Sequence, residues 1–163
     1  SSHFGYDGKH RTQIKKYNDG SRKSVNKNLK NYALSARRLA LKLNELNASL
    51  IIFAPLVNHP EFTLATCSEQ WFRLSTRKGC YQTSKDYLEK QRLHIIREMK
   101  LLDKEVSNIY VFDPFEEYCD KKHCFVQSNG EFLYVDDNHL SEKGALIIFD
   151  SFMSLLNKIK SDL

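Results

Sequence analysis

The chain has 163 residues, of which 41% are hydrophobic and 28% are charged, an ordinary composition for about one soluble domain. Its longest nearly continuous apolar stretch, Leu50 to Val57, contains a proline and is too short to cross a bilayer, and the composition and patterning also exclude collagen, a coiled coil and a solenoid. The net charge of +5 arises in residues 1–30, with eight basic and two acidic side chains; the remainder has 17 basic and 18 acidic residues.

Residues 1–23 contain three glycines and an Asn-Asp-Gly turn sequence, which predict no regular element. We interpret this basic, turn-rich segment as a solvated loop; the alternative is a contact to phosphate or to an anionic membrane face. The segment has neither interleaved aromatic residues nor a groove-reading motif, so we expect no nucleic-acid partner.

Two helices and two strands are predicted in alternation along the next part of the chain. Apolar residues recur at three- and four-residue intervals over 24–47, which indicates an amphipathic helix with Ser24 as its N-cap. The apolar run Leu50–Ala54 is typical of a strand buried on both faces. Residues 55–83 are expected to form an excursion from the sheet edge, after which Ser84 caps a second helix that reaches about Leu102.

The second buried strand is predicted over Asn108–Phe112, where Asp113-Pro114 ends it, and one last helix is capped by Ser141. This order indicates an α/β fold: a three-layer α/β/α arrangement of the flavodoxin-like kind, with a parallel sheet. Two strong strands are too few to bury three amphipathic helices. We therefore expect residues 1–163 to be one partial domain, with its α/β body at 24–163. It would be the C-terminal part of a larger domain whose earlier strands lie upstream or on a partner chain.

The four cysteines form two local pairs, Cys67 with Cys80 and Cys119 with Cys124. A twelve-residue gap does not make a zinc knuckle, so we expect no metal site. We predict one disulfide within each pair, which would place the chain in an oxidising compartment. Free buried thiols and a zinc site are the alternatives.

No G-x-S-x-G, G-x-G-x-x-G, P-loop or H-E-x-x-H sequence occurs, so the candidate chemistry rests on D-x-x-H pairs. We interpret Asp7/His10 and Asp120/His123 as solvated polar pairs. The third pair, Asp136 and His139, stands between an apolar run and a capped apolar helix. There a carboxylate can orient an imidazole whose other nitrogen serves a nucleophile, and we expect the carboxylate to hydrogen-bond to the ring. The alternative is a structural turn with His139 packed on Leu140.

The block Tyr134-x-Asp136-x-x-His139-Leu140-Ser141-x-x-Gly144-Ala145 resembles the last block of the SGNH hydrolase and acyltransferase superfamily. It is most similar to the SGNH domain fused behind the membrane part of acyltransferase-3-type O-acyltransferases. The resemblance covers about residues 24–158, because both strands and the cysteine pairs that follow them match that subfamily's pattern.

This resemblance implies that His139 is a catalytic general base and that Asp136 orients it. The reaction would transfer an acyl group, in our hypothesis acetyl, to or from a carbohydrate hydroxyl through an acyl-serine, without metal or cofactor. The expected partners are an acyl donor, a carbohydrate acceptor, the upstream part of the domain and a membrane acyltransferase domain. The expected location is extracytoplasmic, periplasmic and membrane-tethered through a segment outside this chain.

The family's G-D-S nucleophile block does not occur in the chain, and Asp19-Gly20-Ser21 has the wrong order. Ser2 is a weak candidate for the nucleophile, and the glycine and asparagine of the oxyanion hole are not identifiable. The rival hypothesis is a non-catalytic carbohydrate-binding or scaffolding domain in which the pair is structural.

Overall fold

The computed structural model describes residues 22–68 and 80–162, so the predicted basic loop lies almost entirely outside the described residues. The described elements follow in chain order: α2 (Arg22–Asn44), β1 (Leu50–Phe53), α3 (Leu64–Cys67), β2 (Gln82–Ser84), α4 (Lys85–Glu105), β3 (Ile109–Phe112), the 3-10 helix η2 (Phe115–Tyr118), β4 (His123–Phe125), β5 (Gln127–Ser128), β6 (Glu131–Phe132), α5 (Glu142–Ile147) and α6 (Phe149–Asp162).

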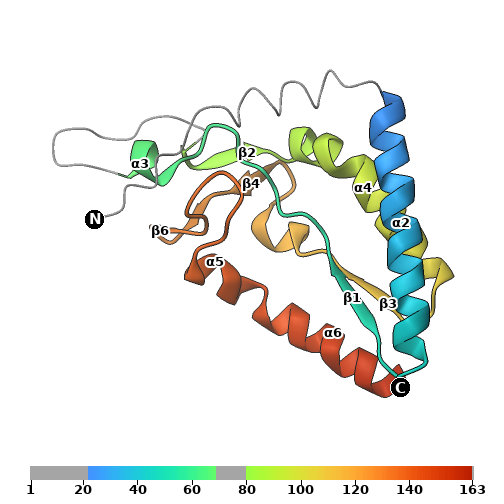
Figure 1. The fold of residues 1–163 in the computed structure, drawn as a ribbon. Coiled ribbons are helices and arrows are strands. Elements are labelled where there is room, and N and C mark those ends of the chain that lie inside the picture. Colours follow the sequence, from blue (N-terminus) through green and yellow to red (C-terminus); the bar gives the residue numbers. More distant parts are fainter. Residues whose placement is uncertain (1–21, 69–79, 163) are drawn as a thin grey trace, which may run out of the picture.

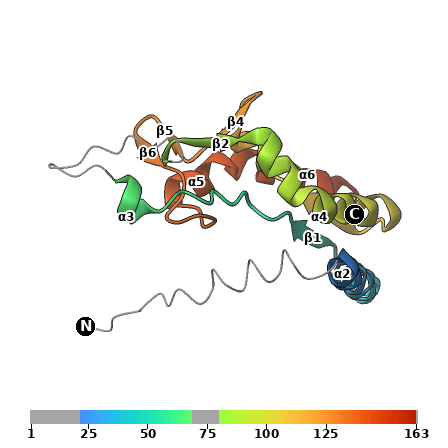
Figure 2. The same cartoon turned by 90° about the horizontal axis from the view of Figure 1, so that it is seen from above.

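The two predicted strands pair in parallel, as expected, with Leu50 opposite Ile109 and Phe53 opposite Phe112. One face of this pair packs against α2 and α4, where a buried cluster is formed by Ala36, Ala40, Ile52, Ala54, Met99, Leu102 and Ile109. On the opposite face Phe152 of α6 lies 5.2 Å, between ring centroids, from both Phe53 and Phe112. Figure 1 places these three helices around β1 and β3, at one end of the molecule, and Figure 2 shows the same helices near β1.

The remaining described strands form two small antiparallel sheets, β2–β4 and β5–β6, at the other end of the molecule (Figure 1). The cysteine-bearing stretches, interpreted as irregular excursions, therefore contain short strands. Asn129 and Gly130 have φ of 51° and 80° and join β5 to β6, the left-handed conformation that a two-residue hairpin turn requires. Helices and mixed small sheets are observed, while the three-layer arrangement and the partial-domain boundaries stay predictions.

Several local predictions are wrong in detail. Strand β1 is not buried on both faces, because the Phe53 side chain is 52% exposed. Ser24 lies inside α2 rather than capping it. The last helix is two helices, since Ile148 leaves the helical conformation (φ −89°, ψ 1°) and its N–H bonds to the Leu146 carbonyl. This break lets Ile147 and Ile148 pack on the core around the short strands while α6 turns to cover Phe53 and Phe112.

Both other predicted caps are confirmed. The Ser84 hydroxyl accepts a hydrogen bond from the backbone N–H of Tyr87, and the Ser141 hydroxyl accepts one from the N–H of Gly144 at 3.0 Å. Each satisfies a donor that the first turn of a helix leaves without a partner. Ser141 also donates to the Phe132 carbonyl at 2.6 Å, which fixes the start of α5 against β6.

Gly144 generates the first prediction, because a Cβ at this position would collide with the Leu133 carbonyl oxygen. That carbonyl accepts from Ser141 and is held in the core, so it has little room to retreat. We expect Gly144→Ala to lower the free energy of unfolding by about 3 kcal/mol, measured by chemical denaturation. The control is Gly130→Ala, which meets open space and carries only the left-handed backbone strain of about 1 kcal/mol. Equal losses would contradict the steric argument.

The two disulfides generate the second prediction, since they enclose loops with sequence separations of 13 and 5 residues. A longer loop loses more conformational entropy when it is closed. We expect the double variant Cys67→Ala/Cys80→Ala to lose about 3 kcal/mol and Cys119→Ala/Cys124→Ala about 2 kcal/mol. Both pairs lose two sulfurs, so the difference reports loop closure. A larger loss for the shorter loop would show that local packing dominates.

Candidate active site

The loop that carries Asp136 and His139 is closed at its base by main-chain pairing. Tyr134 and Leu140 form an isolated antiparallel bridge, and the N–H of Val135 donates to the His139 carbonyl at 2.9 Å. Inside the loop, Oδ1 of Asp136 accepts from the backbone N–H groups of Asn138 (3.0 Å) and His139 (2.8 Å). This is an Asx turn, in which a short acidic side chain replaces a backbone acceptor. The turn itself therefore brings residue 139 back over residue 136.

The ring of His139 meets the carboxylate that forms the turn. Its Nδ1 lies 2.8 Å from Oδ2 and 2.9 Å from Oδ1 of Asp136, the contact expected for a carboxylate that orients the ring. The His139 side chain is 69% exposed and that of Asp136 is 38% exposed. The ring is thus not buried against Leu140, and the catalytic role of the pair stays a prediction.

Opposing effects act on the pKa of Asp136. Partial burial raises it, but the N–H of Asn138, the ring of His139 and the N–H of His139 together lower it below its ordinary value. The ionised carboxylate accepts hydrogen bonds only, so Nδ1 of His139 must carry the proton that joins them. In the neutral ring this leaves Nε2 as the acceptor, which is the state a general base needs.

The second D-x-x-H pair provides an internal comparison. Oδ1 of Asp120 accepts from the N–H groups of Lys122 and His123, both at 2.6 Å, and these hydrogen bonds lower the pKa of Asp120. The turn is the same, but the His123 ring makes no hydrogen bond to Asp120 in the part of the chain that the structure describes. The pair Asp7 and His10 lies outside the described residues. Spacing therefore predicts the turn, and the ring contact distinguishes Asp136 and His139.

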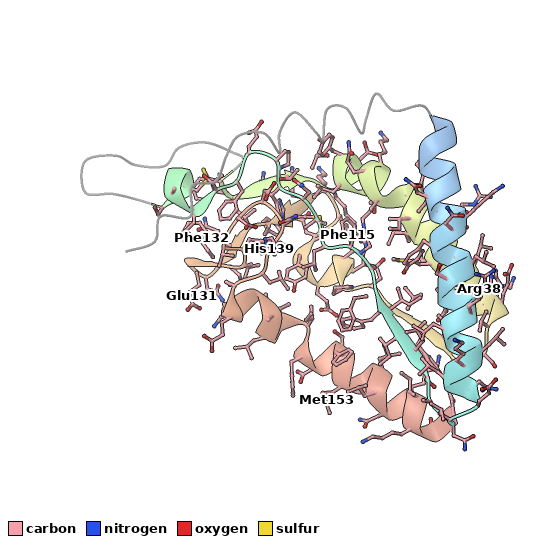
Figure 3. The ribbon with its side chains drawn as sticks, in the orientation of Figure 1. Arg38, Phe115, Glu131, Phe132, His139 and Met153 are labelled. Carbon is pink, nitrogen blue, oxygen red and sulfur yellow. A yellow bond between two sulfur atoms is a disulfide. The ribbon has the colours of Figure 1, made fainter. Side chains whose placement is uncertain are left out.

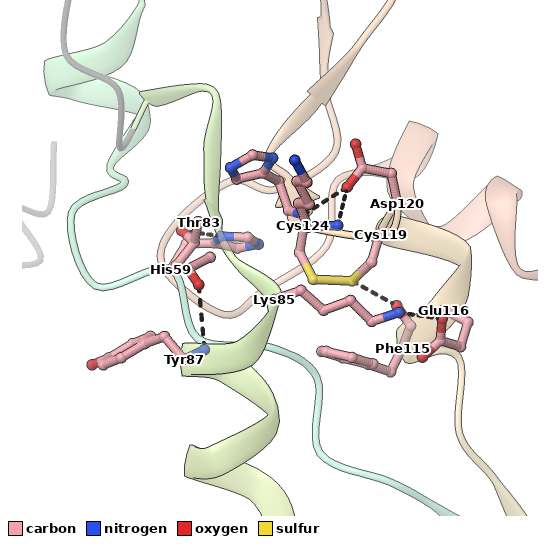
Figure 4. The surroundings of a disulfide bond; sticks show 12 residues. His59, Thr83, Lys85, Tyr87, Phe115, Glu116, Cys119, Asp120 and Cys124 are labelled. Atoms are coloured by element: carbon pink, nitrogen blue, oxygen red, sulfur yellow. Dashed lines mark hydrogen bonds and ion pairs between the residues drawn. A yellow bond between two sulfur atoms is a disulfide. The ribbon is translucent and has the colours of Figure 1, made fainter.

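His59, a buried residue that the sequence analysis did not identify, contacts this loop from the core. The backbone N–H of His59 donates to the Asp137 carbonyl at 2.7 Å, and its ring lies edge-on to Tyr134 with 4.7 Å between centroids. Both side chains are fully buried. Nδ1 of His59 and Oγ1 of Thr83 share a hydrogen bond of 2.9 Å, which Figure 4 shows. The only feature of the sequence that could have drawn attention to His59 is its position shortly after the strand β1.

A cavity of about 310 Å³ lies at the other end of the molecule. It is lined by Arg37, Leu41, Asn44, Glu105, Val106, Ser107 and Asn108, near the amino end of β3. Figure 3 shows Arg38 of α2 at that end and His139 beside Phe132 at the opposite one. This cavity therefore does not belong to the site of Asp136 and His139.

Comparison with known proteins decides the family. The family model of the SGNH domain that is fused to AT3 domains matches residues 2–154. The chain belongs to this SGNH family. Neither the search of curated proteins nor the search of solved structures found a match. The family supports a function related to acyl transfer.

In this SGNH domain the four cysteines form the two predicted disulfides, Cys67–Cys80 and Cys119–Cys124. The free-thiol and zinc alternatives therefore do not apply to them. Cys67, Cys80 and Cys124 are buried in the cluster that also contains Tyr134, so both bridges join the core behind the candidate site. The disulfides and the family together indicate an extracytoplasmic location. None of the described helices is long and apolar enough to span a membrane.

The SGNH nucleophile is not found at the ring of His139. Within residues 28–68 and 80–162, no serine hydroxyl forms a hydrogen bond with His139. Ser141, two residues away, is used for the α5 cap and the Phe132 carbonyl. Ser2, the weak sequence candidate, lies outside the described residues. In the described part of the chain, Asp136 and His139 thus form a carboxylate–imidazole pair in which only Nδ1 of the ring is engaged.

His59 generates a prediction about acid stability. Burial lowers its pKa to about 4, whereas in the unfolded chain it titrates at about 6.5. Between these values the unfolded chain takes up a proton that the folded chain does not, so stability falls as pH decreases, by up to about 3 kcal/mol. The groups that contact it, the Thr83 hydroxyl and the Tyr134 ring, do not titrate in this range.

Denaturation of the wild type and of His59→Asn between pH 7 and pH 4 measures this contribution. We expect the wild type to lose more stability than the variant across the window, because all other groups titrate alike in both proteins. Parallel stability curves would show that His59 is protonated as readily in the folded chain as in the unfolded one.

Proposed function

We propose that His139 and Asp136 are the general base and the orienting acid of a serine-dependent acyl-transfer site. The single observation that carries this proposal is the hydrogen bond from an exposed imidazole to an ionised carboxylate, with Nε2 left available. Membership of the SGNH family supports it, because hydrolases and acyltransferases of this superfamily use such a pair.

The chemistry proceeds in two halves. Nε2 of His139 takes the proton of a serine hydroxyl as its oxygen attacks the acyl carbonyl, and the imidazolium then gives that proton to the leaving group. In the second half an acceptor hydroxyl loses its proton to Nε2 as it attacks the acyl-serine, and the serine recovers a proton from the ring. Asp136 keeps Nδ1 protonated and stabilises the imidazolium in both halves. Neither half requires a metal or a cofactor.

The family match does not identify the substrates, so their assignment is part of the proposal. We propose an acetyl group as the acyl unit and a carbohydrate hydroxyl as the acceptor, with a membrane acyltransferase domain of the AT3 type as the partner that supplies the acyl group. A periplasmic position fits a domain with two disulfides, because disulfides form and persist in that oxidising compartment. The contacts of α2 and α4 on one face of β1–β3, and of α6 on the other, support the three-layer arrangement.

The test measures hydrolysis of 4-nitrophenyl acetate and transfer of acetyl to an oligosaccharide by the intact protein. We expect His139→Ala to lower kcat/KM by about 10³-fold or more and Asp136→Asn by about 10² to 10⁴-fold, because the amide favours the wrong tautomer. The matched control is His123→Ala, which removes the histidine of the second D-x-x-H pair and should change kcat/KM less than about twofold.

A fluorophosphonate probe with mass spectrometry gives an independent readout, because it labels only a serine whose hydroxyl is activated. We expect one labelled serine in the wild type and in His123→Ala, and strongly slowed labelling in His139→Ala. If folded His139→Ala retains the activity and labelling of His123→Ala, the pair is structural and the proposal fails. If the wild type shows neither activity nor a labelled serine, the non-catalytic carbohydrate-binding hypothesis is favoured instead.

A further inference from the structure

His59 contacts both flanks of the acid in the candidate site. Its ring packs edge-on against Tyr134, two residues before Asp136, and its backbone N–H binds the carbonyl of Asp137, the next residue. The Asp136 side chain thus projects from a four-residue stretch, 134–137, that is held at both ends by one buried residue. These contacts join parts of the chain that lie 75 or more residues apart.

The His59 ring is itself held from the other side. Nδ1 shares a hydrogen bond with Thr83 of β2, and Cys80, three residues before Thr83, is bonded to Cys67 in the segment that follows His59. Thr83 also pairs with Cys124 in the β2–β4 sheet, and Cys124 forms the disulfide with Cys119. Figure 4 shows His59, Thr83 and this disulfide together. The ring is therefore anchored to the most covalently restrained part of the described chain.

Polar atoms are retained in this core at a cost to stability. Nε2 of His59 and the hydroxyl of Tyr134 are buried and have no hydrogen-bond partner among the described residues. Each such atom costs stability that an apolar side chain of similar shape would not. A core selected for stability alone would favour phenylalanine at either position, so a role other than packing is indicated for the histidine.

We propose that His59 is a positioning residue, which holds the Asp136–His139 loop in the geometry of acyl transfer through Tyr134 and Asp137. The inference rests on the proposed function. Acting through Asp136, His59 sets where the carboxylate meets Nδ1 and hence where Nε2 points. A ring that swings away by about 1 Å costs on the order of 10²-fold in rate, because the attack distance and angle are lost.

Two substitutions separate the contacts of the His59 ring. His59→Phe keeps a ring against Tyr134 and loses the hydrogen bond to Thr83, whereas His59→Asn keeps a polar atom near the position of Nδ1 and loses the ring. We expect both to lower kcat for acetyl-ester hydrolysis by about 10- to 100-fold with KM changed less than about threefold. The control is Met99→Ala, which removes a buried side chain from the separate cluster around β1, α2 and α4. It should lower the melting temperature by at least as much and leave kcat unchanged.

A readout without catalysis keeps the two proposals distinguishable. In protein labelled with ¹⁵N-histidine, a proton on Nδ1 of His139 that is bonded to Asp136 gives a downfield resonance. We expect this resonance to shift or broaden in both His59 variants and to stay in place in Met99→Ala. If it moves as expected while no variant, wild type included, transfers acetyl, the positioning stands and the proposed function fails. If it stays unchanged, or if kcat falls only in proportion to the folded fraction, His59 is a packing residue and the inference is overturned.

Discussion

Burial of the Tyr134 ring is the constraint on which the candidate site depends. The ring is fully enclosed by a cluster that both disulfides enter, and its backbone starts the loop that returns at Leu140. Because Tyr134 is enclosed by the core, Asp136 begins its turn from a defined position, and the hydrogen bond from the Val135 N–H to the His139 carbonyl closes the loop. An exposed pair of side chains thereby acquires a defined geometry from a core in which neither takes part. Most surface ion pairs lack such support and contribute little to structure.

The two ends of the molecule use different means to become rigid. Around β1 and β3 the helices bury apolar side chains, and Asn108 fixes the start of β3 by donating to the carbonyls of Ala40 and Ala48. Around the short strands the pairing is too limited to hold a core by itself, since two- and three-residue strands are marginal. At that end the two disulfides and the hydrogen bond between His59 and Thr83 hold the segments together. Arg92 of α4 links the ends: it pairs with Asp113 at the close of β3 and covers the Phe115 ring.

Interactions within a few residues were predictable from the sequence, and those between distant segments were not. The caps at Ser84 and Ser141, the local cysteine pairs and the contact of Asp136 with His139 depend on residues close in the chain, and the sequence predicted these, although the cap at Ser24 was wrong. His59 was missed because its partners, Thr83, Tyr134 and Asp137, are brought to it by the fold, and no spacing rule connects them.

The break at Ile148 was missed for the same reason: the apolar pattern of the last helix continues through it, and only the two clusters that α5 and α6 cover require the change of direction. The exposure of Phe53 likewise depends on what packs beside β1, which its own apolar run does not encode.

The Asx turn narrows the choice of residue at position 136 more than proton chemistry does. A glutamate offers the same charge to an imidazole, but its extra methylene displaces the oxygen from the two N–H groups that the aspartate caps. Asparagine or serine closes the same turn and brings no negative charge. Aspartate is thus the one side chain that meets both demands, and the two are coupled: Oδ1 binds the main chain, while both oxygens of the same carboxylate contact the ring, so a change in the backbone turn moves the group that holds the histidine.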